Sequence, residues 1–134
     1  MPITILRLGP PRQPNEGLRL GTVRRPPRGV PKAAFARRDF YDVWLPNLAP
    51  SEPLLKQALA AQKESPENEA RIWKALERRF RSEMKQPDAS RLLDLLASLS
   101  HQTSFSLGCY CAEENRCHRS VLRKLLAERA AAFN

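Results

Sequence analysis

A strand-like segment at residues 103–109 lies between two helical segments, and this arrangement constrains the fold more than any other feature. The segment reads Thr-Ser-Phe-Ser-Leu-Gly-Cys, and its closest neighbours along the chain are helical in pattern. Because an isolated strand is not stable in water, its partners must come from the first third of the chain. We therefore expect one α/β domain in which strands from both halves of the chain share a sheet.

Three segments near the N-terminus can supply those partners. Residues 3–8 and 18–23 combine β-branched side chains with alternating polarity, and residues 40–45 form a short apolar and aromatic run. With residues 103–109 they predict a mixed sheet of about four strands. Residues 24–32 form a basic loop, because their prolines neither donate to a strand ladder nor continue a helix.

Four to five helices are expected to pack on this sheet. Ser51 and Ser65 each precede a proline and a glutamate, a pattern typical of a capped helix N-terminus. Further helices follow Pro87 and Asn115. The domain, residues 1–134, divides into a basic strand and loop part (1–50), a helical part (51–100) and a strand–loop–helix motif (103–130).

The net charge of +9 is concentrated at the N-terminus. Residues 1–38 contain nine Lys or Arg and a single acid, Glu16, whereas the remaining residues carry 14 basic and 13 acidic side chains. Such a local positive potential attracts phosphates or acidic partners. An anionic small molecule or a nucleotide is therefore the expected partner, and nucleic acid bound by the basic third is the alternative.

No apolar stretch approaches the roughly 20 residues needed to cross a bilayer, and the apolar N-terminal run is shorter than a signal peptide. We therefore expect a cytoplasmic protein without a membrane partner. All three cysteines lie within residues 109–117. In a reducing compartment, clustered thiols are typical of metal, redox or catalytic sites rather than of disulfides.

These cysteines fall at the junction between the late strand and the last helix, in the sequence Cys-Tyr-Cys-Ala-Glu-Glu-Asn-Arg-Cys-His-Arg of residues 109–119. The free amides and the dipole of a helix N-terminus favour a thiolate or a bound anion there. Cys111 and Cys117 are the candidate nucleophiles and His118 the candidate base. If the protein is an enzyme, this predicts cysteine-dependent chemistry on a phosphate- or sulfur-containing substrate. The candidate anion-binding residues are Arg24, Arg28, Lys32, Arg116 and Arg119.

Two other interpretations of the cluster stay open. Cys109, Cys111, Cys117 and His118 are four suitable ligands for a structural zinc ion of the Cys₃His type. If Asn115 caps the helix, however, adjacent Cys117 and His118 point about 100° apart, which disfavours a shared ion. The cysteines are alternatively small apolar residues of the core.

Several segments resemble the domain-of-unknown-function 488 family, in its Cys…Cys-His-Arg branch. They include Arg28-Gly29 with Lys32, and the sequence Asp-Val-Trp-Leu-Pro-Asn-Leu-Ala-Pro-Ser of residues 42–51. The strand ending in Cys-Tyr-Cys and the following Cys117-His118-Arg119 are similar to the signature of that branch. The resemblance covers about residues 3–127 and implies a single α/β domain.

The sequence thus predicts a small α/β protein that binds an anionic or phosphorylated small molecule or a nucleotide at the Cys/His/Arg junction, with or without a reactive cysteine. A nucleic-acid-binding protein and a Cys₃His metal site are the alternatives.

Overall fold

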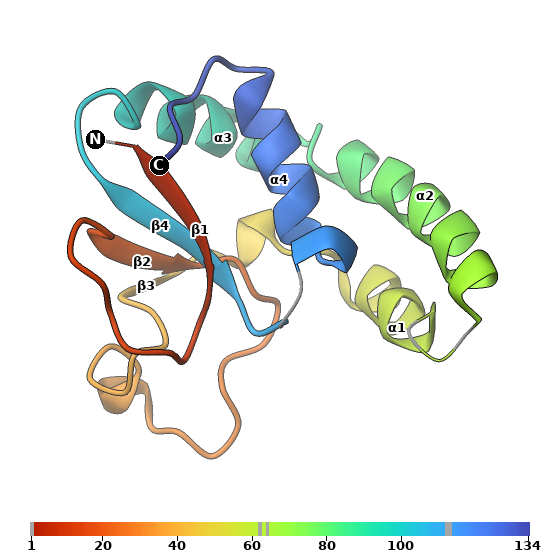
Figure 1. The fold of residues 1–134 in the computed structure, drawn as a ribbon, viewed down its shortest axis with the longest axis horizontal. Coiled ribbons are helices and arrows are strands. Elements are labelled where there is room, and N and C mark those ends of the chain that lie inside the picture. The colour runs from red at the N-terminus through yellow and green to blue at the C-terminus, as the bar shows by residue number, and fades with distance from the viewer. Residues whose placement is uncertain (1, 62, 64, 112–113) are drawn as a thin grey trace.

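Four parallel strands form the central sheet (Figure 1), in the order β1 (Ile3–Arg7), β4 (Phe105–Cys109), β2 (Leu18–Gly21) and β3 (Val43–Trp44). The structure is a computed structural model that describes residues 1–134 except 1, 62, 64 and 112–113. A small α/β domain with a four-stranded sheet is confirmed. The sheet is not mixed, however, because all three neighbouring pairs run parallel. Because the strands are parallel, the carboxyl ends of all four lie at the same edge of the sheet.

In the part of the chain that the structure describes, four α-helices follow the predicted order. Ser65 caps the second helix, because its hydroxyl accepts a hydrogen bond from the Asn68 amide. The helices are α1 (Glu52–Ala61), α2 (Pro66–Glu83), α3 (Pro87–Leu99) and α4 (His118–Ala127). Short 3-10 helices lie in the connections, at Lys32–Ala34, Pro46–Leu48 and Glu114–Arg116. None of the helices in the described part of the chain has the length and apolar character that a bilayer crossing requires.

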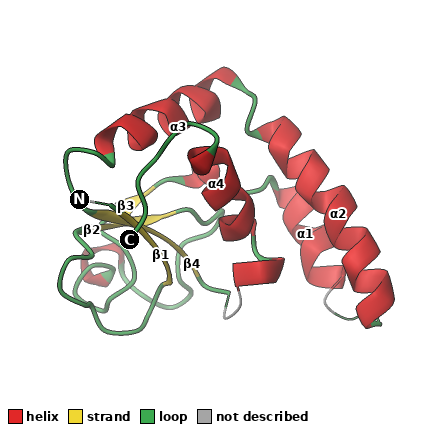
Figure 2. Cartoon of the chain, turned by 45° about the horizontal axis from the view of Figure 1, so that its top comes forward, coloured by secondary structure: helices red, strands yellow, loops and turns green. Residues whose placement is uncertain are grey.

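The helices cover one face of the sheet. Phe105 and Leu107 of β4 are buried there in one apolar core with residues of α2, α3 and α4. Helices α1 and α2 pack on each other and extend away from the strands (Figure 2). This arrangement leaves the carboxyl edge of the sheet bordered by α4 on one side and by the basic loop on the other.

Loops from the N-terminal third cover the opposite face. Gly21 and Gly108 make this close packing possible, because a Cβ atom at either position would overlap the side chain of Tyr41 or Leu8. The hydroxyl of Ser106 donates to the Glu16 carbonyl at 2.8 Å, which joins β4 to the loop between β1 and β2.

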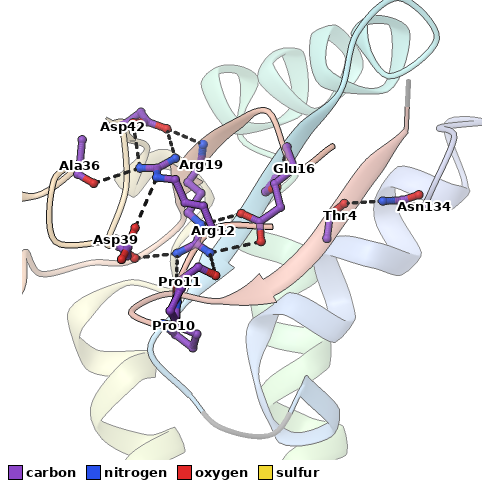
Figure 3. Close-up of polar contacts among 11 residues, drawn as sticks. Thr4, Pro10, Pro11, Arg12, Glu16, Arg19, Ala36, Asp39, Asp42 and Asn134 are labelled. Carbon is purple, nitrogen blue, oxygen red and sulfur yellow. Dashed lines mark hydrogen bonds and ion pairs between the residues drawn. The ribbon is translucent and has the colours of Figure 1, made fainter. Parts of the chain in front are cut away.

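A buried ion pair holds these loops in place (Figure 3). Arg19 is 1% exposed, and its guanidinium donates to both carboxylate oxygens of Glu16 and to the carbonyls of Pro10, Pro11 and Asp39. One of the nine N-terminal basic residues thus serves the fold and is not available to a ligand.

Candidate functional site

The carboxyl ends of β2 and β4 and the N-terminus of α4 meet at one point of the sheet edge. Cys109 ends β4, and Cys117 precedes the first residue of α4. His118 contacts Thr22, which directly follows β2, through its Nε2 atom and the Thr22 carbonyl. Residues that are almost one hundred positions apart in the chain therefore line the same site, as is usual at the carboxyl edge of a parallel sheet.

The three cysteines and His118 converge at this junction. The Sγ atoms of Cys109 and Cys111 are 3.7 Å apart, and Cys117 Sγ lies 3.7 Å from Nδ1 of His118. One donor atom each from Cys109, Cys117 and His118 lies within 4.8 Å of the other two. All three cysteines are free thiols, and only Cys111 is more than slightly exposed.

The helix begins later than the sequence predicted, and this changes the geometry of the cluster. The N-cap of α4 is Cys117, with an extended backbone (φ −125°, ψ 149°), and not Asn115. Residues Glu114–Arg116 form a separate 3-10 helix before it. Because Cys117 is outside the helical repeat, its side chain and that of His118 converge, and the objection to a shared metal ion disappears.

The thiol pKa values differ across the cluster. The pKa of Cys117 is lowered far below its usual value, because its sulfur accepts hydrogen bonds from Cys109 and Cys111 and lies beside His118. The pKa of Cys109 is raised, because its thiol donates to Cys111, lies against the sulfur of Cys117 and is buried. Without a metal ion, the arrangement therefore favours one thiolate, on Cys117.

Arg119 is part of this cluster and is itself buried. It is 3% exposed, its Nε lies 3.4 Å from Cys117 Sγ, and its Nη2 donates to the Cys111 carbonyl at 2.7 Å. No carboxylate among the described residues pairs with it. A buried guanidinium requires a negative partner, and the sulfur of Cys117 is the one that the described residues offer.

A small apolar cavity of about 50 Å³ flanks the cluster on the side of α1 and α2. Its walls include Trp73 and Phe80, and the Phe80 ring meets the imidazole of His118 edge to face with the centroids 5.6 Å apart. This side of the cluster is therefore screened from water by aromatic and aliphatic side chains.

Two of the other predicted basic residues are already engaged by the protein, although Arg116 lines the small cavity beside Cys111 and Cys117. Arg24 donates to the carbonyls of Pro46, Ala49 and Pro50, and Arg116 pairs with Glu69 at 3.5 Å. In the described ranges, no ion-pair partner of Arg28 or Lys32 occurs, and both side chains are exposed. Arg28 and Lys32 are thus the members of the predicted anion-binding set that remain free to meet a ligand.

A recess of about 370 Å³ adjoins the junction on the side of the basic loop. It is lined by Arg25, Arg28, Phe40 and Tyr110, together with two prolines. The rings of Phe40 and Tyr110 meet edge to face with centroids 6.3 Å apart, and the Tyr110 hydroxyl donates to the Arg25 carbonyl at 3.1 Å.

Sequence reasoning did not identify Thr22 or Arg25 as site residues. Thr22 acts through its backbone carbonyl, which no side-chain pattern can reveal. Arg25 was one of several arginines in the same loop, and only the contact of this loop with Tyr110 distinguishes it.

Comparison with known families places most of the chain in one of them. The model of the family DUF488-N3a, described as an active DUF488-N3 subclade, matches residues 3–130. A search of curated proteins and a search of solved structures found no match.

Proposed function

Because this chain belongs to the DUF488 family, in a subclade described as active, we propose that the site at its sheet edge serves a ligand: an anionic small molecule, best exemplified by a nucleotide. The proposed location is the recess lined by Arg25, Arg28, Phe40 and Tyr110. The observation that carries the proposal is the combination of an exposed guanidinium, which has no ion-pair partner among the described residues, with two aromatic rings in one concave site.

Each part of the recess has a role that suits a nucleotide. The guanidinium of Arg28 can donate two parallel hydrogen bonds to a phosphate group. The faces of Phe40 and Tyr110 offer a surface on which a base can stack. A volume of about 370 Å³ is within the usual range for small-molecule sites. Arg25 contributes less charge, because Glu52 already pairs with it.

The position of the recess also favours a ligand site. It lies where the chain leaves β4 and where the loop after β2 begins, at the carboxyl edge of a parallel sheet. Ligands of open α/β folds bind at this edge, because the loops there are free to carry polar side chains while the strands hold them rigidly.

Thermal unfolding in the presence of nucleoside monophosphates and of inorganic phosphate tests the proposal. A ligand at about 100 times its Kd stabilises the folded protein by about 2.7 kcal/mol. We expect a rise in Tm that is larger for a nucleotide than for phosphate, and that is lost in Arg28→Ala. Arg37→Ala is the matched control, since Arg37 is also exposed and lies outside the recess. A rise that is equal in both variants would refute the assignment of the recess.

Single-stranded nucleic acid is a second candidate, and a second recess favours it. A hollow of about 330 Å³ lies next to the first, shares Pro26 with it, and is lined by Lys32, Phe35, Tyr41 and Trp44. Two adjoining aromatic sites with basic side chains suit successive bases of one strand. An oligonucleotide that binds much more tightly than a mononucleotide, with an affinity that falls steeply with salt, would support this candidate.

A further inference from the structure

We propose that Cys109, Cys111, Cys117 and His118 bind one zinc ion, which links the end of β4 to the start of α4. This inference concerns the cluster behind the recess, and it holds whether or not the recess binds a nucleotide.

Two separations within the cluster match the edges of a tetrahedral site. Zinc–sulfur bonds of about 2.3 Å place two sulfur ligands about 3.8 Å apart, and a zinc–nitrogen bond of about 2.0 Å makes the sulfur–nitrogen edge about 3.5 Å. The observed separations are 3.7 Å between the sulfurs of Cys109 and Cys111, and 3.7 Å between Cys117 Sγ and His118 Nδ1. The donor atoms of Cys109, Cys117 and His118 already lie within 4.8 Å of one another, so zinc needs to draw them together by about 1.3 Å at most.

The imidazole of His118 is oriented as a metal ligand. Its Nε2 faces the carbonyl of Thr22, which can only accept a hydrogen bond, so Nε2 carries the proton. Nδ1 of the neutral ring then presents its lone pair towards Cys117 Sγ. A ring nitrogen bound to a backbone carbonyl is the usual outer contact of a histidine that coordinates zinc, because it fixes the tautomer and the plane of the ring.

The charge of the occupied site agrees with its surroundings. On binding, the thiol protons pass to solvent, and a dication with three thiolates and a neutral imidazole carries a net charge of −1. Arg119 supplies one positive charge within the same buried region, with its Nε 3.4 Å from Cys117 Sγ. The negative zinc–thiolate centre and the positive guanidinium of Arg119 thus neutralise each other, which buried charges require.

The site has four protein ligands and therefore no open position for a substrate, which is the property of a structural zinc site. The apolar cavity beside Phe80 and Trp73 keeps water from one side of it. Tyr110 lies between two of the ligands, Cys109 and Cys111, and its ring forms a wall of the recess. The ion would therefore also hold that wall in place.

Metal analysis of the full-length protein is the first test. Protein purified without chelator should contain about one zinc per chain, and cobalt in its place should give the visible and near-ultraviolet absorption of a tetrahedral thiolate site. The charge-transfer absorption depends on the number of thiolates, so each Cys→Ser substitution should lower it by about one third. Removal of the metal should lower the Tm of the wild type.

Variants with matched controls locate the site. His118→Asn should lose the stoichiometric zinc, whereas His101→Asn should retain it, since the other histidine is exposed and bonded to the Ala130 carbonyl. Arg119→Met keeps all four ligands and should weaken zinc binding about 10- to 100-fold.

One combination of results would overturn the proposal. It consists of wild-type protein that holds less than about a tenth of an equivalent of zinc, takes up no cobalt with thiolate absorption, and has a thiol at Cys117 that is alkylated rapidly near neutral pH. The cluster would then be the site of a reactive thiolate. Because the wild type alone provides these three measurements, the test does not depend on whether a variant folds.

Discussion

Replacing Glu16 by glutamine tests whether Arg19, one of the N-terminal arginines, stabilises the fold through its buried ion pair and is therefore not available to a ligand. Glu16 has a side chain that is 9% exposed and accepts two hydrogen bonds from Arg19, whose side chain is 1% exposed. The substitution keeps the size of the side chain but leaves the guanidinium buried without a counter-charge. Breaking a buried pair in this way costs about 3–5 kcal/mol, and we expect the lower end, because carbonyls of Pro10, Pro11 and Asp39 still accept from Arg19.

A loss of about 3 kcal/mol is a large part of the stability of a domain of this size, which is about 5–15 kcal/mol. In urea, with a slope of about 2 kcal/mol per molar, the midpoint should fall by about 1.5 M. Glu52→Gln is the control, because it removes the same charge from Arg25 in a pair whose side chains are 54% and 45% exposed. The control should lose less than about 1 kcal/mol. If the two variants lost the same free energy of unfolding, burial would not make the Arg19–Glu16 pair more important for stability than the exposed Arg25–Glu52 pair.

Three further predictions concern single residues. Partial burial raises the pKa of Asp42, but hydrogen bonds from Arg12 and the Arg19 amide outweigh it and lower this pKa overall. The carboxylate therefore stabilises the fold at neutral pH, and in urea titrations the deficit of Asp42→Asn should shrink as the pH falls below about 4. Tyr41→Phe should unfold at the same or a higher Tm, because in the described part of the chain the buried hydroxyl finds no partner. Gly108→Ala should lower the urea midpoint, because the new methyl group overlaps the Leu8 side chain; an unchanged midpoint would contradict this packing.

Local patterns predicted most of the elements of this fold. Ser65 and the proline after it mark the start of α2, because a capping hydroxyl and a fixed φ act within one helical turn. The late strand was predicted from its own residues and is observed at Phe105–Cys109. Its place between β1 and β2 also follows the expectation that N-terminal strands pair with it.

The direction of the strands was not predictable in the same way. Val43–Trp44 is only two residues long, and its parallel pairing with β2 depends on the path of the loop between them. Such a path is the result of long-range packing, including the ion pair of Arg19 with Glu16 and the bonds from Arg12 and the Arg19 amide to Asp42. No periodic pattern in the sequence predicts the path of this loop.

For the candidate site, the sequence determined which reactive side chains are present, and the tertiary structure decided which groups they contact. The clustering of three cysteines, His118 and Arg119 at a strand–helix junction is evident from composition and spacing alone. The choice of Cys117 as N-cap, the carbonyl of Thr22 opposite His118 and the burial of Arg119 arise only when β2, β4 and α4 meet. The same holds for the basic residues. An arginine is available to a ligand only where no protein acceptor already binds its guanidinium. Long-range contacts provide such acceptors for Arg19 and Arg24 and place Arg28 in the recess instead.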